Sequence, residues 1–576
     1  MKAATANSGF FQEKPAWQNQ FDADPTLLRV LQFFGSKFTL NRSIPELRAL
    51  GQDVISREVF DYMDDAEKNL PYIVHNDSWG RPLNKLVTSH GWKMLKSMAA
   101  EKGIVATSYN ERYIYGADAR LIGTAKAYLF TPSSALISCP LAMTDGCARL
   151  LEVFGSGKDD YEEIFRRLTT TNPDQFWTSG QWMTERPGGS DVSRTETIAR
   201  EASDMKGNSA YEIDGFKWFS SATDSEVCAL LAKRSTHPEE GVTCFLGYVQ
   251  RGGVRLHRLK EKFGTKPLPT AELELQGMKA DIIGKPGQGV RVISTILNIT
   301  RLHCGIASVA AWRRALSIAK AYSNVRSVFG KPLNSIPLHV RILAEQETLL
   351  RGVTFLTFFA AALMGQEENN PNVIHEYSKA LLRIIPGINK AFTCKATISG
   401  ISECMEAMGG VGYLEHEVEF NIGRLLRDSQ VSTIWEGTTN VLADDFVRYS
   451  HKDWNTVKAS VKWLVQDKLK SVEGPELSEL KKVVLGDLQK WIKQVEELSF
   501  DDLRRESRTV VFPLAKLIIQ TLLLSDVKRD GGIGSKEDRV AYLIAREWIA
   551  GTHGDNTDDC LIVYGDYSAH KFAGKL

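Results

Sequence analysis

The feature that most constrains the fold of this 576-residue chain is a change of hydrophobic periodicity, from helical to strand-like and back. Apolar residues recur with helical spacing from Pro25 onward. Residues 179–290 hold short runs such as CALLAKRS, TCFLGYVQ and TAELELQGM, which predict strands. Helical spacing then returns. We therefore expect an α+β protein with an arm and helical domain (1–178), a β-domain (179–290), a helical bundle (291–450) and an additional all-helical domain (451–576).

Composition excludes several classes of function. The formal net charge is +1, and residues 451–576 hold twenty Lys/Arg and twenty Asp/Glu, so DNA binding is unlikely. The eight cysteines form no C-x-x-C pair, which predicts no metal site. The longest apolar runs, 353–364 and 510–524, predict buried helices rather than membrane spans. The first residues resemble no signal peptide. We expect a soluble intracellular protein and leave cytosol or mitochondrial matrix open.

One acidic residue stands out by its surroundings. Glu436 lies in the otherwise uncharged run VSTIWEGTTN, and Gly437 follows it, so the backbone can turn or approach a ligand closely. A carboxylate among apolar groups is poorly solvated, and its pKa should rise. Such a group suits a general base for a weakly acidic C–H proton. The alternative is a loop Glu before a helix capped by Thr438, Thr439 or Asn440.

The surrounding segment resembles a family motif. RDSQVSTIWEGTTN (427–440) is similar to R-D-x-x-[IV]-x-x-I-[YW]-E-G-T of the acyl-CoA dehydrogenases. The resemblance implies that Glu436 takes the α-proton of an acyl-CoA thioester while FAD takes the β-hydride. It also assigns Trp435, Thr438 and Asn440 to the cofactor and Gly437 to the substrate.

Two segments of the β-region resemble the flavin-binding segments of that family. In QWMTERPGGSDVSRTET (181–197) one departure is Arg186-Pro187, where Glu-Pro is usual. In YEIDGFKWFSSA (211–222) an aromatic strand would lie against the flavin, or would simply form a hairpin strand. By this resemblance the cofactor-binding residues are Met183, Thr184, Gly189, Ser190, Trp218, Phe219, Ser220 and Ser221. Ser190 is assigned to the substrate as well.

The long helical segment after residue 291 ends in YSNVRSVFGKPL, which resembles Y-x-x-x-R-x-x-F-G-x-P-[LI]. The resemblance implies that Arg326 and Phe329 contact the FAD of a neighbouring subunit. Asn298 and Arg301 stand where relatives contact acyl-CoA. Thr300 stands where other branches of the family carry the catalytic Glu, which leaves Glu436 as the matching base.

The segment EAMGGVGY (406–413) resembles the turn that meets the neighbouring flavin, and assigns Glu406, Gly409 and Gly410 to the cofactor. Glu406 and Pro337 replace glutamines found in many members. Both replacements recur in the AidB-like branch, as does the extra C-terminal helical domain. The chain is therefore identified as AidB-like, with a central β-barrel or sandwich.

The resemblance implies an FAD-dependent acyl-CoA dehydrogenase that converts a fatty acyl-CoA to the trans-2-enoyl-CoA in lipid metabolism. It also implies a homotetramer, built as a dimer of dimers, with an electron-transferring flavoprotein as acceptor. Small residues at Ser133, Ser134, Ala135 and Ser138 lead us to expect a medium-to-long acyl chain. The alternatives are an AidB-like flavoprotein or an acyl-CoA-binding regulator with slow or vestigial activity.

Overall fold

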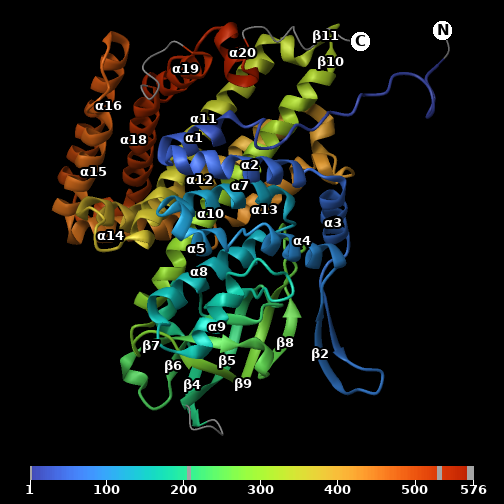
Figure 1. The fold of residues 1–576 in the computed structure, drawn as a ribbon, viewed down its shortest axis with the longest axis vertical. Coiled ribbons are helices and arrows are strands. Elements are labelled where there is room, and N and C mark those ends of the chain that lie inside the picture. Colours follow the sequence, from blue (N-terminus) through green and yellow to red (C-terminus); the bar gives the residue numbers. More distant parts are fainter. Residues whose placement is uncertain (1–2, 204–208, 528–534, 567–576) are drawn as a thin grey trace.

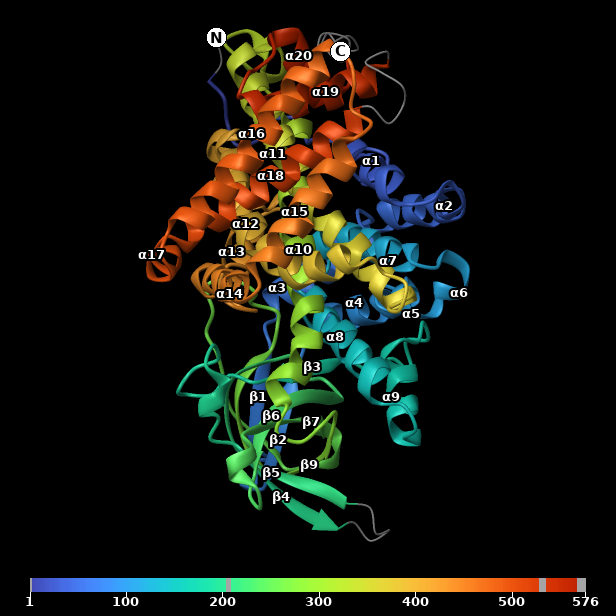
Figure 2. The same cartoon turned by 90° about the vertical axis from the view of Figure 1, so that its left-hand side faces the viewer.

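The computed structural model describes residues 3–203, 209–527 and 535–566. A β-domain forms one end of an elongated molecule, and helices form the middle and the other end (Figure 1). A group of helices from the last part of the chain, drawn in orange and red, lies to one side of the central bundle in Figure 1 and in front of it in Figure 2. The catalytic candidate, Glu436, lies in the turn that joins α13 (Ile422–Val431) and α14 (Thr439–Lys452).

The N-terminal part is helical, as predicted. Helix α1 shows why: the Asp24 side chain accepts hydrogen bonds from the N–H groups of Thr26 and Leu27, and Pro25 occupies the first turn. The helices are α1 (Pro25–Phe34), α2 (Lys37–Asp53), α3 (Arg57–Lys68), α4 (His90–Glu101), α5 (Thr107–Asn110), α6 (Arg112–Tyr115), α7 (Asp118–Phe130), α8 (Ser138–Phe154) and α9 (Asp159–Leu168).

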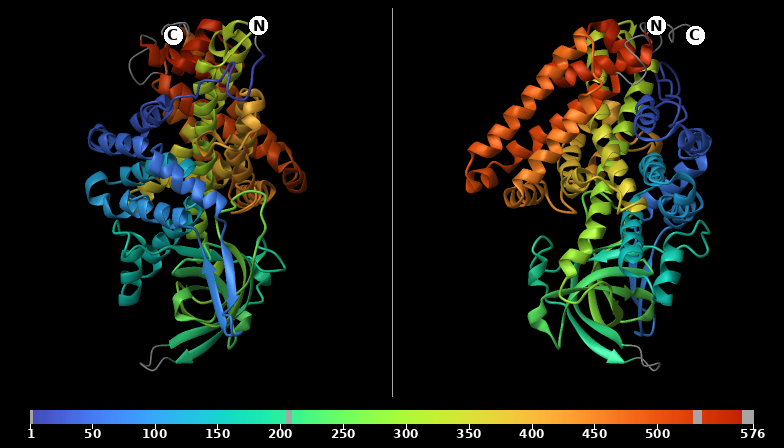
Figure 3. Two further views of the ribbon diagram at one scale, coloured as in Figure 1. Left: turned by 90° about the vertical axis from the view of Figure 1, so that its right-hand side faces the viewer. Right: turned by 60° about the vertical axis from the view of Figure 1, so that its left-hand side comes forward.

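An antiparallel hairpin interrupts these helices. Its strands are β1 (Tyr72–Asn76) and β2 (Pro82–Val87), which the helical periodicity did not predict. The Asn84 side chain bonds the backbone of β8 at Val254 and Leu256, which fixes the hairpin to the side of the β-domain (Figure 3). Asp77 and Gly80 lie between the strands, and Asn76 and Pro82 lie at the strand ends, so this segment has the composition of a loop.

The β-domain contains seven strands. They are β3 (Ser179–Trp182), β4 (Ile198–Ser203), β5 (Ser209–Ser221), β6 (Val227–Arg234), β7 (Val242–Tyr248), β8 (Val254–Leu259) and β9 (Thr270–Ile282). Successive pairings β6–β4, β4–β5, β5–β9, β9–β7 and β7–β6 close a ring, and β3 and β8 add to β6 and β9. The predicted barrel-like domain is confirmed.

Strand β6 joins the β-domain to the helices. Cys228, Leu230 and Ala232 belong to the core enclosed by the strands. Val227, Ala229 and Leu231 alternate with them and belong to the helical core. A strand buried on both faces reads as a continuous apolar run, which explains the sequence VCALLA.

Three long helices form the central bundle: α10 (Gly289–Val325), α11 (Pro337–Asn369) and α12 (Glu376–Glu406). The short hairpin β10 (Ser327–Val328) and β11 (Lys331–Pro332) follows α10, and α13 (Ile422–Val431) packs on α10 and α12. By length and composition α10, α11 and α18 could each cross a membrane, but 61%, 89% and 78% of their most apolar windows are buried inside the protein. The runs 353–364 and 510–524 lie within α11 and α18.

The remaining helices are α14 (Thr439–Lys452), α15 (Trp454–Leu469), α16 (Pro475–Glu497), α17 (Phe500–Arg505), α18 (Ser507–Val527), α19 (Lys536–Ala550) and α20 (Asn556–Tyr564). Those after residue 450 form an additional module that packs on α11. Trp548 Nε1 donates to the carbonyl of Thr348 at 2.8 Å, across this contact. We keep the division at residues 178, 290 and 450 as a proposed domain organisation.

A buried ion pair also joins the first helix to the additional module. Arg29 Nε of α1 lies 2.5 Å from Asp526 Oδ2 of α18, and Arg29 Nη2 lies 3.2 Å from Asp538 Oδ1 of α19. All three side chains are at most 6% exposed. The two carboxylates need this cation, because a buried charge without a partner is costly.

We predict that Arg29→Met lowers the free energy of unfolding by about 3–5 kcal/mol, because it leaves the two buried carboxylates without this guanidinium. Urea unfolding followed by tryptophan fluorescence measures the change. Arg57→Met is the matched control, since the Arg57–Asp61 pair is exposed to solvent and should contribute little to stability. Equal losses in the two variants would contradict this account of how the module is attached.

Candidate functional site

The turn between α13 and α14 holds Glu436 in an uncommon backbone conformation. Glu436 has φ 57° and Gly437 has φ 94°, both in the left-handed region. This region costs a non-glycine residue about 1–3 kcal/mol, so the surrounding structure must hold it there. Thr438 is the N-cap of α14, and its hydroxyl accepts a hydrogen bond from the Val441 N–H at 3.4 Å. The capping interpretation of this segment is thus compatible with a role for Glu436.

Two cations bind the carbonyl oxygens of this turn. Lys390 Nζ, from the middle of α12, donates to the Gly437 carbonyl, and the Lys390 side chain is fully buried. Arg301 Nε, from α10, donates to the Glu436 carbonyl at 3.3 Å. The two central helices therefore fix the backbone on both sides of the Glu436–Gly437 peptide.

The Glu436 carboxylate has two further neighbours. Thr300 Oγ1 donates to Glu436 Oε2 at 2.6 Å, and Gln181 Nε2 of β3 lies 3.5 Å from the same oxygen. Burial raises the pKa of Glu436 above its ordinary value, although the Thr300 and Gln181 hydrogen bonds and the Arg301 and Lys390 charges oppose the shift. The raised pKa expected from the apolar sequence context is present in the structure.

The Cys139 thiol of α8 is close enough to Glu436 to interact with its charge. Burial, with the Glu436 carboxylate adding to it, raises the pKa of Cys139 to about 12. The thiol is therefore protonated at neutral pH and is not an alternative base or nucleophile.

The predicted flavin segments meet next to β3. The Trp218 N–H donates to the Thr184 carbonyl at 2.9 Å, which joins the segment after β3 to β5. Met183 is half-buried, while Gly189 and Ser190 are exposed on the loop that follows. That loop is anchored by a buried pair, Lys217 Nζ to Glu185 Oε1 at 2.6 Å.

Arg186, which departs from the family motif, packs against two aromatic rings. Its guanidinium lies 4.1 Å from the centre of the Phe216 ring and 6.0 Å from that of Trp218. Lys260 Nζ lies 3.2 Å from the centre of the Trp218 ring and 2.6 Å from Glu272 Oε1. Arg186 and Lys260 thus lie over the indole of Trp218, the ring predicted to face the flavin, and cation–π attraction holds it in place. Phe219, beside it, is 52% exposed.

Buried polar atoms on or beside the predicted flavin segments test whether these residues fit a polar cofactor. Gln181 Oε1, Ser220 Oγ and Trp435 Nε1 are buried, and none has a hydrogen-bond partner among the described residues. Such groups are usually paired in native proteins, so these atoms are available to a ligand. They lie on three segments that the sequence assigned to, or placed beside, the flavin. Ser221 differs, because its hydroxyl bonds Thr270 Oγ1 at 3.0 Å.

Five predicted cofactor residues lie elsewhere. Arg326 follows the last residue of α10, about 38 Å along the helix from Arg301 at 1.5 Å per residue. Glu406 ends α12, about 24 Å along that helix from Lys390. Phe329 is fully exposed, and Glu406, Gly409 and Gly410 are exposed as well. The structure does not bring these residues to Glu436 within one chain.

The residues used to predict the substrate divide into two groups. Asn298 is half-buried on α10, one turn before Arg301, close to the base. By contrast, Ser133, Ser134 and Ala135 are fully buried, and the Ser133 hydroxyl donates to the Val54 carbonyl at 2.6 Å. Their small size serves close packing, so it does not support the prediction of a long acyl chain.

Sequence reasoning missed two residues that contact the site. Lys390 lies in the helical run INKAFTCK, where a lysine is usually an exposed charge. Gln181 is the second residue before Met183, but the family motif begins only at Met183. No group of three or more metal-ligating side chains occurs among the described residues.

Comparison with known protein families finds a match for each of three regions of the chain. Residues 287–449 match the model of the acyl-CoA dehydrogenase C-terminal domain, and 180–278 match that of the middle domain. Residues 12–175 match the N-terminal domain of the adaptive response protein AidB.

Individual relatives extend the similarity over most of the chain. Acyl-CoA dehydrogenase family member 11 of Caenorhabditis elegans is 36% identical over 93% of this chain and 88% of the relative. Putative acyl-CoA dehydrogenase AidB of Escherichia coli is 28% identical over 70% of this chain and 74% of its own. The crystal structure of Caenorhabditis elegans ACDH-11 in complex with C11-CoA superposes with a TM-score of 0.88 at 34% identity, covering 96% and 94% of the two chains.

We predict that Glu436→Gln stabilises the protein more at about pH 8 than at about pH 5. With a raised pKa, the native carboxyl resists ionisation while the unfolded one ionises near its ordinary value of 4.5, so this group lowers stability as pH rises between the two values. A pKa difference of one between the native and unfolded states corresponds to about 1.4 kcal/mol. Thermal unfolding of wild type and variant at both pH values measures the difference.

The exposed Glu417 supplies the control, because Glu417→Gln also removes one negative charge. If Glu436→Gln had the same effect as the control at both pH values, burial of the Glu436 carboxylate would not be costly.

Proposed function

The chain belongs to the acyl-CoA dehydrogenase family, oxidoreductases that act on CH–CH groups, and we propose that it dehydrogenates a fatty acyl-CoA to the trans-2-enoyl-CoA. One observation carries the proposal: the buried Glu436 carboxylate, with its raised pKa, in a turn held by Arg301 and Lys390. The fixed backbone aims the carboxylate, and the raised pKa makes it a stronger base than an exposed Glu.

The proton step follows from the surroundings of Glu436. Its carboxylate removes the α-proton of the thioester and becomes neutral, which burial favours. Thr300 Oγ1, which donates to Oε2, keeps one carboxylate oxygen occupied and leaves Oε1 for the proton. Arg301 and Lys390 are positioning residues in this scheme, since each contacts the backbone of the turn.

FAD is the proposed cofactor, as in the family. When bound, it would accept the β-hydride of the substrate. In this chain the segments Met183–Thr184 and Trp218–Ser221 would hold it on the β-domain side, together with Gly189, Ser190, Trp435, Thr438 and Asn440. Ser220 Oγ and Trp435 Nε1, buried without partners among the described residues, are suited to that contact.

We propose a medium-to-long acyl chain for the substrate, with Ser190, Asn298, Arg301 and Gly437 in contact with acyl-CoA. The chain length is supported by the relative ACDH-11, which was crystallised with C11-CoA. We further propose a soluble intracellular enzyme of lipid metabolism, with an electron-transferring flavoprotein as acceptor. A regulator that binds acyl-CoA with slow turnover is the second candidate.

The separation of the cofactor residues supports a homo-oligomer. Arg326, Phe329, Glu406, Gly409 and Gly410 lie far along α10 and α12 from the base and are accessible. We propose that they contact the FAD of a neighbouring subunit, in a dimer of dimers.

We predict that Glu436→Gln slows flavin reduction by acyl-CoA at least ~100-fold, because the amide cannot accept the proton. FAD content and acyl-CoA affinity should change little, since the side-chain size is kept. Anaerobic bleaching of the flavin in stopped flow measures the rate, and Glu417→Gln is the control. Equal bleaching in both variants would reject Glu436 as base. Tight acyl-CoA binding with no bleaching even in wild type would favour the regulator.

We predict that Arg326→Ala weakens FAD retention without unfolding the protein, because it removes a guanidinium suited to a pyrophosphate. The ratio of flavin to protein absorbance after gel filtration measures retention, and the elution volume reports the oligomeric state. Arg291→Ala, at an exposed position near the other end of α10, is the matched control. A monomer that retains FAD normally would contradict the shared site.

A further inference from the structure

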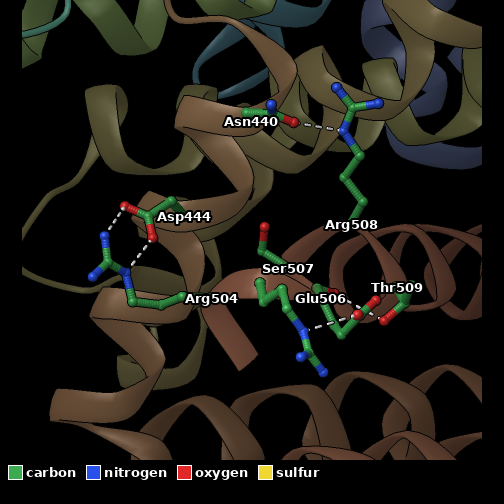
Figure 4. Close-up of a pocket in the computed structure, with 8 residues that line it drawn as sticks. Asn440, Asp444, Arg504, Glu506, Ser507, Arg508 and Thr509 are labelled. Carbon is green, nitrogen blue, oxygen red and sulfur yellow. Dashed lines mark hydrogen bonds and ion pairs between the residues drawn. The ribbon is translucent and has the colours of Figure 1, made fainter. Parts of the chain in front are cut away.

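A pocket lies between helix α14, which follows the catalytic turn, and the additional module. It has a volume of about 430 Å³ and is lined by Asn440 and Asp444 of α14 and by residues 504–509, which connect α17 to α18 (Figure 4). Every lining side chain is polar or charged. The volume suits a small ligand, but the lining excludes an acyl chain, which needs an apolar surface.

Three arginines line the pocket, and two of them pair with carboxylates. Arg504 Nε lies 2.7 Å from Asp444 Oδ1, and Arg505 lies 3.3 Å from both Asp502 and Glu506. Arg508 differs. Its Nε donates to Asn440 Oδ1 at 2.7 Å, and no carboxylate within the described ranges pairs with it. The pocket therefore holds one guanidinium whose charge and two terminal nitrogens are available to an anion.

A buried hydroxyl faces the same space. Ser507 is 7% exposed and lines the pocket, and its Oγ takes part in none of the side-chain hydrogen bonds of the described residues. Figure 4 shows this hydroxyl directed into the space between Arg508, Asn440 and Arg504. Ser507 is also the first residue of the 21-residue helix α18, whose positive end favours an anion. The Ser507 hydroxyl is therefore open to the pocket and can donate a hydrogen bond to a ligand there.

We propose that this pocket binds the phosphate or pyrophosphate group of a nucleotide, through Arg508, Ser507 and the amide of Asn440. A guanidinium, a hydroxyl and a helix N-terminus together are the donors that phosphate oxygens accept from. A carboxylate ligand would meet the same donors, but a group with more oxygens satisfies all of them at once.

The site has two possible sources for its phosphate. Asn440 is four residues from Glu436, so the phosphate could belong to FAD or CoA bound at the catalytic turn. It could also belong to a free nucleotide whose binding would affect that turn through α14. The chemistry of recognition is the same in each case. If FAD or CoA is the source, the proposal rests on the proposed function.

The test is a calorimetric titration of the purified, FAD-loaded protein with inorganic pyrophosphate, ADP and adenosine 3′,5′-bisphosphate, the last standing for the phosphorylated end of CoA. Binding should weaken about tenfold or more in Arg508→Gln, which loses a charged donor, and about two- to tenfold in Ser507→Ala. Arg166→Gln on α9, an exposed arginine paired with Glu163, is the matched control and should bind like wild type.

The outcomes of this test distinguish a free nucleotide, CoA and FAD as the source of the phosphate. Binding of pyrophosphate or ADP to the loaded protein, lost in Arg508→Gln, supports a free nucleotide, and a preference for the 3′,5′-bisphosphate supports CoA. No binding to the loaded protein, with FAD lost from Arg508→Gln but retained by Arg166→Gln, supports FAD. No binding and unchanged FAD content in both variants would overturn the proposal. None of these readouts requires turnover, so a failure of the proposed dehydrogenation is detected separately.

Discussion

The carbonyl oxygens of Glu436 and Gly437 are each bound by a cation, and the position of the candidate base depends on those two contacts. The turn has two consecutive residues with positive φ, one of which is not glycine. An isolated loop would relax from that conformation. Lys390 and Arg301 come from the middle of α12 and α10, so the packing of the bundle is what holds the carboxylate in place.

The β-domain completes the surroundings of the base from the opposite side. Gln181 reaches Glu436 from β3, and β3 pairs with β6, the strand that is buried on both faces. The same strand anchors the predicted flavin loop, because Lys217 Nζ bonds both Glu185 and the Leu231 carbonyl. The site therefore lies where two cores meet, and a change in the packing of either core would move one half of it relative to the other.

The sequence was sufficient for the class of each region and for the poorly solvated setting of Glu436, because both depend on local patterns. Thr300 could also be singled out, by its place in a family motif. Lys390 could not, since a lysine in a helix is normally exposed and only the tertiary structure shows that it is buried against the Gly437 carbonyl. The hairpin β1–β2 was missed because its turn residues outweighed the short β-branched run at Ile73 and Val74. The contact of Arg508 with Asn440 joins residues 68 positions apart, which no local pattern reveals.

Helix α10 connects the two places in the molecule at which function is proposed. Thr300 and Arg301 lie beside the base, and Arg326 follows the end of the same uninterrupted helix. Each residue of an α-helix turns the chain by about 100° and advances it by 1.5 Å. One residue inserted between positions 301 and 326 would turn Arg326 to a different side of the helix axis, even if every other residue were unchanged. The helical backbone thus fixes the position of Arg326 relative to the buried surroundings of Glu436.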